Sequence, residues 1–78
     1  MSTTTELAEQ IASLVEEENE LQAEVVYLTK QIQAEVNDKE AGELAKYLSD
    51  AAHRWAMVLA EIGRTKVSLE LERSHQRR

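Results

Sequence analysis

Apolar side chains spaced alternately three and four residues apart constrain the fold of this chain more than any other feature of its sequence. In the first half the series is Leu7, Ile11, Leu14, Glu18, Leu21, Val25, Leu28 and Ile32, and Glu18 is its one charged member. In the second half it is Leu44, Leu48, Ala51, Trp55, Val58, Ile62, Thr65 and Leu69. We call these residues the seam. Such a stripe follows one side of a helix and is the heptad repeat of coiled coils, so the sequence predicts two long helices packed along their seams.

The composition also favours an all-α fold. The 78 residues include no proline and only two glycines, Gly42 and Gly63, and residue types that favour helices dominate. No segment alternates apolar and polar residues as a half-buried strand does. A chain of this length forms one domain, to which we assign residues 1–78.

Two motifs of the capping-box type indicate where the helices begin. Thr3 is followed three positions later by Glu6, and Asn37 is followed by Glu40 at the same spacing. In this motif the first side chain accepts a hydrogen bond from a free backbone N–H of the first helical turn. We expect a first helix at about 4–36, a turn at about 37–38, a second helix at about 38–74 and a basic C-terminal tail at 73–78.

A short turn makes the two helices antiparallel neighbours, which gives a coiled-coil-like helical hairpin. Its core is small because the chain is short. Several large apolar residues also lie off the seam. They are Val15, Val26, Met57, Leu59, Val67 and Leu71. Ala45 and Ala52 join Leu59 in widening the apolar face of the second helix. We therefore expect two hairpins to assemble into a four-helix bundle or a higher homo-oligomer, or another protein to cover these residues.

The acidic residues are concentrated in the first half of the chain. The formal net charge is −6, of which residues 1–36 contribute −7 (eight Glu, one Lys) and residues 37–78 contribute +1 (seven acids, eight Lys and Arg). In an antiparallel hairpin the acidic half lies beside the more basic half, so we expect the charges to be balanced largely between the helices. The basic residues of the tail have no aromatic residues among them, which argues against single-stranded nucleic acid as a partner.

The sequence contains no pattern typical of export or membrane insertion. Its start has no basic segment followed by an apolar one, and no apolar run approaches the roughly 20 residues of a membrane span. The chain has no cysteine, so it forms neither a disulfide nor a thiolate metal site. We expect a cytoplasmic protein without a membrane partner.

The only tryptophan stands in the sequence His53-Arg54-Trp55 and has two interpretations. It is either a large anchor of the core or part of a contact with a partner, because Trp, Tyr and Arg contribute much of the binding energy at protein interfaces. The expected partner or oligomer interface consists of Leu21, Tyr27, Tyr47, Trp55, Val58, Leu59 and Ile62.

Glu18 is the most informative glutamate, because it occupies a seam position where an apolar residue is more stable. A carboxylate buried there needs a partner, and Arg54 and Arg64 of the second helix, with His53, are the candidates. A single polar residue in a coiled-coil seam commonly fixes the register and the oligomeric state. We favour this structural role for Glu18 over a catalytic one.

The stretch Glu16-Glu17-x-x-Glu20 resembles the E-E-x-x-E motif of the MazG-like, all-α nucleotide pyrophosphohydrolases. Glu16 and Glu20 share a helix face, and the resemblance implies that they bind Mg²⁺ together. The family also has an E-x-x-D motif on a following helix, and no such motif lies within the predicted second helix at about 38–74. The alternative is a solvated charged face, which we favour.

Arg64 and Lys66 are candidates for binding phosphate, and with Arg54 they suggest a third possibility, a helical bundle that sequesters a nucleotide. The groupings used in catalysis are missing, since there is no cysteine nucleophile, no glycine-rich phosphate loop and no pair of histidines at ligand spacing. We expect a non-enzymatic protein–protein interaction module without a cofactor, either a small adaptor or an inhibitor. Its size and fold are typical of phage-encoded and mobile-element accessory proteins.

Overall fold

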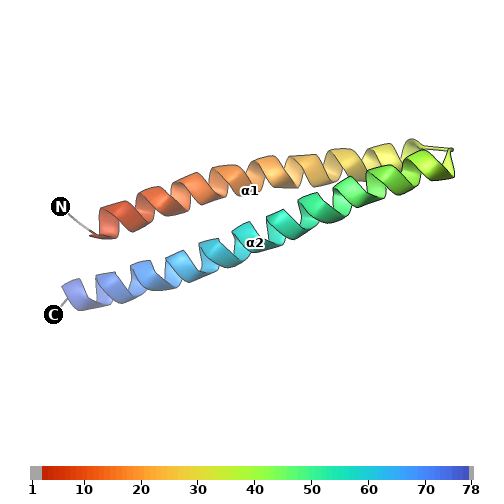
Figure 1. Ribbon diagram of the computed structural model, residues 1–78. Coiled ribbons are helices and arrows are strands. Elements are labelled where there is room, and N and C mark those ends of the chain that lie inside the picture. The colour runs from red at the N-terminus through yellow and green to blue at the C-terminus, as the bar shows by residue number, and fades with distance from the viewer. Residues whose placement is uncertain (1–2, 78) are drawn as a thin grey trace.

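The chain forms a hairpin of two long antiparallel helices (Figure 1). The computed structural model describes residues 3–77, with α1 at Thr3–Ala34 and α2 at Asp38–Gln76. The Cα atoms extend over 62 × 14 × 14 Å, so the molecule is a thin rod with both ends of the chain at one tip. The predicted all-α hairpin is confirmed, although α1 ends two residues earlier and α2 two residues later than expected.

The seam packs between the helices as the heptad spacing predicts. Every seam residue is buried or partly buried, whereas most of the remaining residues are exposed. A cluster of buried apolar side chains lies where Leu21 of α1 meets Val58 and Ile62 of α2, with Leu14 and Trp55 packed against them. The short turn sets this register, because it fixes which residues of the antiparallel helices face each other.

Of the residues that the structure describes, Thr65 is the one polar residue that is buried, at 4% exposure. Its hydroxyl donates a hydrogen bond of 2.8 Å to the carbonyl oxygen of Glu61, one turn earlier in α2. Thr29 makes the same kind of bond to Val25 in α1. These bonds satisfy the two hydroxyl groups within their own helices, so threonine is tolerated in and beside the seam.

The turn at residues 35–37 is closed by side chains that accept backbone hydrogen bonds. Asn37 caps α2, and its Oδ1 accepts from the backbone N–H groups of Lys39 (2.9 Å) and Glu40 (3.3 Å). This half of the predicted capping box is confirmed. The backbone N–H of Asn37 donates to Glu35 Oε1 at 3.0 Å, so a glutamate before the cap supplies the contact that the glutamate three positions after the cap, here Glu40, makes in a capping box.

A side-chain hydrogen bond also joins α1 and α2 at the open end of the hairpin. The side-chain amide of Gln76 donates a hydrogen bond of 2.8 Å to the hydroxyl of Thr4. The segment from residue 73 to Gln76, which we expected to be a tail, is therefore the last turn of α2. Arg78, the last residue of the expected tail, lies outside the described residues.

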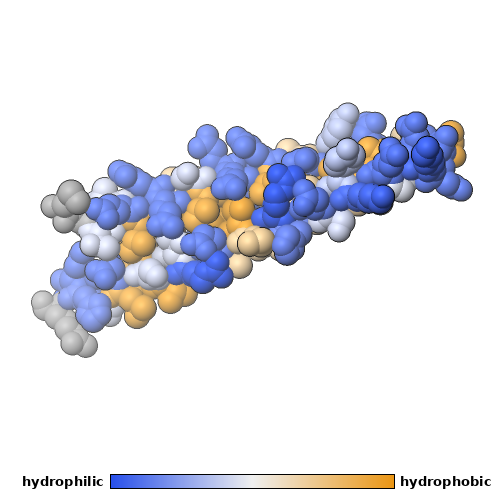
Figure 2. Space-filling view, viewed as in Figure 1, coloured by the Kyte–Doolittle hydropathy of each residue, from blue (hydrophilic) through white to orange (hydrophobic). Residues whose placement is uncertain are grey.

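Large apolar side chains remain on the surface of the rod. Figure 2 shows apolar surface between the helices and along the outer side of α2 in the half of the molecule that carries the chain ends, and a smaller area at the tip with the turn. The exposed large apolar residues of the chain include all six that the sequence places off the seam: Val15, Val26, Met57, Leu59, Val67 and Leu71. Within residues 3–77, no helix is long and apolar enough to cross a membrane.

Candidate functional site

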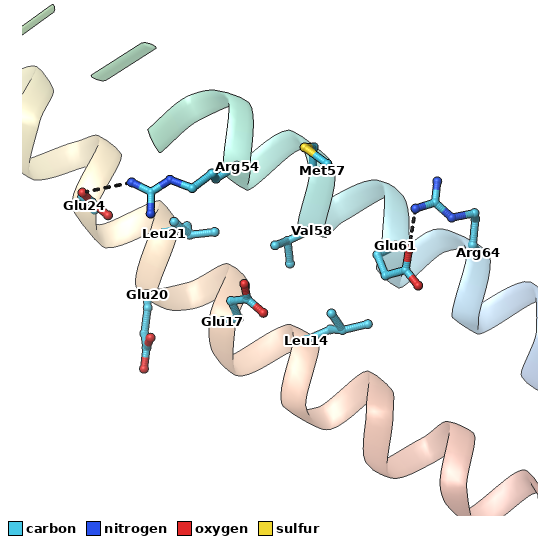
Figure 3. A pocket seen from close by; sticks show the side chains of 10 residues that line it. All are labelled: Leu14, Glu17, Glu20, Leu21, Glu24, Arg54, Met57, Val58, Glu61 and Arg64. Atoms are coloured by element: carbon cyan, nitrogen blue, oxygen red, sulfur yellow. Dashed lines mark hydrogen bonds and ion pairs between the residues drawn. The ribbon is translucent and has the colours of Figure 1, made fainter. Parts of the chain in front are cut away.

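A groove runs along one flank of the seam, where α1 and α2 border a space of about 590 Å³ (Figure 3). Its lining consists of Leu14, Glu17, Glu20, Leu21 and Glu24 of α1 with Arg54, Met57, Val58, Glu61 and Arg64 of α2. Leu14, Leu21 and Val58 point into the space between the helices, whereas Glu20 points away from it. The groove therefore has an apolar floor with charged side chains along both sides.

The two arginines of the groove are already engaged by carboxylates. Arg54 lies 3.8 Å from Glu24 of α1 and 3.4 Å from Asp50 of its own helix. Arg64 pairs with Glu61, one turn before it. Among the described residues, Glu17 and Glu20 form no ion pair, so this flank retains a surplus of negative charge.

Fewer ion pairs join α1 to α2 than the distribution of charge in the sequence suggested. The Arg54–Glu24 pair is the one ion pair that joins α1 to α2 within residues 3–77. The other three, including Arg73–Glu70, lie within α2 at spacings of three or four residues. Exposed pairs of this kind each contribute at most about 1 kcal/mol, so the hairpin depends mainly on its apolar seam.

Glu18 lies in the seam as predicted, but the arginines that we expected to pair with it do not reach it. Its Oε2 atom is buried and has no hydrogen-bond partner. Arg54 and Arg64 extend along the exposed flank to Glu24, Asp50 and Glu61 instead, because their positions in α2 point them out of the seam. The indole N–H of Trp55 is likewise buried without an acceptor.

The residues predicted to contact a partner separate into two groups. Leu21, Val58 and Ile62 are buried within the hairpin and Trp55 packs against them, so these four contribute to the core between α1 and α2. They are seam residues, and the other helix of the same hairpin covers them. The rest, Tyr27, Tyr47 and Leu59, are exposed.

The candidate ligand-binding residues are not gathered into one site. Glu20 lines the groove and Glu16 does not. Nowhere in the described chain do three or more His, Asp or Glu side chains cluster so that they could hold a metal ion. Arg64 lies in the groove, whereas Lys66 lines a separate shallow hollow with Val67 and Leu71.

The flank on the other side of the seam carries no charged residue over most of its length. On α2, Leu59 follows the seam residue Val58, whereas Glu61 of the groove precedes the seam residue Ile62. Each step turns a helix by about 100°, so the two lie on opposite sides of the seam. The same positions define the uncharged flank: Ala8, Ala12, Val15, Asn19, Gln22, Val26 and Thr29 of α1, with Gly42, Ala45, Ser49, Ala52, Ala56, Leu59 and Gly63 of α2.

Sequence reasoning found only part of this flank: Ala45, Ala52 and Leu59 of the second helix, and Val15 and Val26 among the apolar residues off the seam. The signal for the remainder is the absence of charge at the off-seam heptad positions on this side of both helices, which form one surface once the hairpin places them side by side. Comparison of the chain with protein-family models, with curated proteins and with solved structures finds no match.

Proposed function

We propose that this chain is a non-enzymatic protein–protein interaction module that associates with itself and serves as an adaptor or an inhibitor of another protein. The observation that carries the proposal is the exposure of large apolar side chains on a rod too thin to bury them. Among the described residues no large side chain is fully buried, while nine large apolar ones are exposed. Exposed apolar surface of this extent typically marks a contact with another protein chain.

The stability that small domains need also supports the proposal that two hairpins assemble. A layer of two helices has one narrow core, whereas four helices surround a core that is covered on all sides. Domains this small usually gain stability from disulfides, metals or partner chains. The chain has no cysteine, so disulfides are not available to it.

The test is the molar mass of the purified protein, measured by light scattering over a range of concentrations. The proposal requires a mass of at least twice the 8.9 kDa of one chain. A strict monomer at all concentrations would contradict it.

The alternative function, a metal-dependent nucleotide pyrophosphohydrolase, is tested by a separate assay. Release of pyrophosphate from a nucleoside triphosphate in the presence of Mg²⁺ would identify a pyrophosphohydrolase. If Glu16→Gln abolished that release, the proposal of a non-enzymatic module would be overturned. We expect no release with either protein, because Glu16 and Glu20 belong to no cluster of three or more acidic or histidine side chains among residues 3–77 that could hold a metal ion.

A further inference from the structure

We propose that two copies of the chain pack through the uncharged flank, with α2 antiparallel to α2 of the second copy and a two-fold axis at Ala52. This inference rests on the self-association proposed above and adds to it the surface, the orientation and the register. Every pair of neighbouring helices in the resulting four-helix bundle is antiparallel.

A row of five residues on α2 carries the argument: Asp38, Ala45, Ala52, Leu59 and Lys66. Their spacing of seven residues is close to two helical turns, so they form one line on the side of α2 that carries the uncharged flank, with Asp38 and Lys66 just beyond its two ends. The row is complementary to itself when reversed about Ala52. Asp38 then lies opposite Lys66 of the second copy, and the small Ala45 lies opposite the large Leu59.

The charges at the two ends of this row are free to form such contacts. Asp38 and Lys66 are exposed, and within residues 3–77 neither forms an ion pair. An antiparallel dimer contains the pair twice, once at each end. A parallel arrangement about the same row would bring Asp38 against Asp38 and Lys66 against Lys66, which is unfavourable.

The negative charge of the chain limits where a second copy can pack. Each copy has a formal net charge of −6, so most contacts between copies bring carboxylates together. On the groove flank, Glu17 and Glu20 have no ion pair among the described residues. The uncharged flank avoids this repulsion, and loss of charged residues is the compositional mark of the buried centre of an interface.

The two glycines provide a separate line of evidence. Gly42 and Gly63 lie on the uncharged flank, and a Cβ atom at either position would meet nothing within 4 Å. Glycine disfavours the interior of a helix, and nothing inside the hairpin requires it at Gly63. A second helix packed closely on this flank gives the reason, because glycine allows two backbones to approach. Reversal about the same axis places Gly42 one residue, about 1.5 Å along the helix, from the level of Gly63 of the second copy.

The area is sufficient for a stable dimer. From Asp38 to Lys66 the row is about 42 Å long, and two adjacent helices are about 20 Å wide. The resulting face of about 800 Å² on each copy equals the contribution of one partner to a standard protein–protein interface.

Disulfide cross-linking tests the axis directly, because the natural chain has no cysteine. A residue on the two-fold axis lies opposite the same residue of the second copy. Ala52→Cys should therefore form a covalent dimer in high yield on oxidation. The matched control is Ala60→Cys, an exposed alanine on the outer side of α2, which should remain largely uncross-linked. Equal yields for the two variants would overturn the proposed axis.

Charge variants test the surface and the orientation. Ala52→Glu places two carboxylates against each other on the axis and should weaken dimerisation at least 100-fold, whereas Ala60→Glu should leave it unchanged. Asp38→Lys and Lys66→Asp should each weaken it about three- to tenfold, and the double variant should restore it. A double variant that dimerises no better than either single one would overturn the antiparallel register. Circular dichroism checks that each variant remains helical.

The outcomes separate this inference from the proposed function. A wild-type protein that is strictly monomeric would overturn both. A wild-type dimer that Ala52→Glu leaves intact and that Met57→Glu disrupts would place the contact on the groove flank. That result would overturn the inference and leave the proposed self-association standing.

Discussion

At the scale of single residues, two buried side-chain atoms within residues 3–77 have no hydrogen-bond partner, Glu18 Oε2 and the indole nitrogen of Trp55. A buried carboxylate oxygen that accepts no hydrogen bond costs free energy, and an apolar side chain of similar size avoids that cost. Glu18 therefore weakens the seam at the position next to its best-packed cluster. Its presence is consistent with a role in choosing between alternative assemblies rather than in stability.

Glu18→Leu should raise the free energy of unfolding by about 1–3 kcal/mol, because it replaces the unpaired carboxylate with buried apolar surface. Urea denaturation followed by circular dichroism measures the change, and light scattering should show a broader range of oligomeric states. Glu16→Leu is the control, since Glu16 is exposed and its replacement should change stability little. A Glu18→Leu protein that melts lower and keeps one oligomeric state would contradict this interpretation.

Asn37→Ala should lower the free energy of unfolding by about 1 kcal/mol, because the first turn of α2 loses the acceptor of two backbone hydrogen bonds. The same urea titration measures the loss. Ser13→Ala, at an exposed position within α1, should change stability by no more than about 0.5 kcal/mol. An equal loss in both variants would show that the Asn37 cap is not a specific contribution.

At the scale of the helices, stability depends on which side of α2 a residue occupies. Val58 lies in the seam at 8% exposure, and Val67 lies on the surface at 60%. Val58→Ala should cost about 2 kcal/mol, because it removes buried apolar contacts and leaves a cavity beside Leu21 and Ile62. Val67→Ala should cost less than about 0.5 kcal/mol in the free hairpin. Similar losses for the two variants, measured by urea denaturation, would contradict the described seam.

The helices and their pairing could be predicted because the heptad spacing is a local property that sequence displays directly. The ends of the helices and the contacts of individual side chains were less predictable. Glu35 rather than Glu40 bonds to the backbone of Asn37, since the exact path of the turn decides which carboxylate reaches it. The pairing of Arg54 and Arg64 with neighbours rather than with Glu18 depends on side-chain direction, which the seam pattern does not specify.

The candidate surfaces were only partly predictable for a different reason. Trp55, Val58 and Ile62 have the residue types of an interface and of a core alike, and only their burial distinguishes the two. The uncharged flank is made from two segments of sequence that become one surface after folding. The extent of this flank depends on which residues of α1 lie beside which residues of α2. The sequence alone predicts that register only approximately.

At the scale of the whole molecule, self-association should make thermal stability depend on protein concentration. Assembly favours the folded chain by mass action, so a 100-fold dilution should lower the Tm by about 5–10 °C. The Tm of the Ala52→Glu variant should be lower than that of the wild type and independent of dilution. Calorimetry or circular dichroism at matched concentrations measures both, and a wild-type Tm that does not move with concentration would contradict an assembled state.

The hydrogen bond between Thr4 and Gln76 has a consequence for how the rod can be linked to other proteins. It holds the two ends of the chain together at one tip, while the turn at Asn37 lies at the far tip of a rod 62 Å long. A domain fused at either end would therefore leave from the same tip, and the opposite tip would remain free as a spacer. The same closeness permits a circularly permuted chain, with a short linker across the old ends and new ends at the turn.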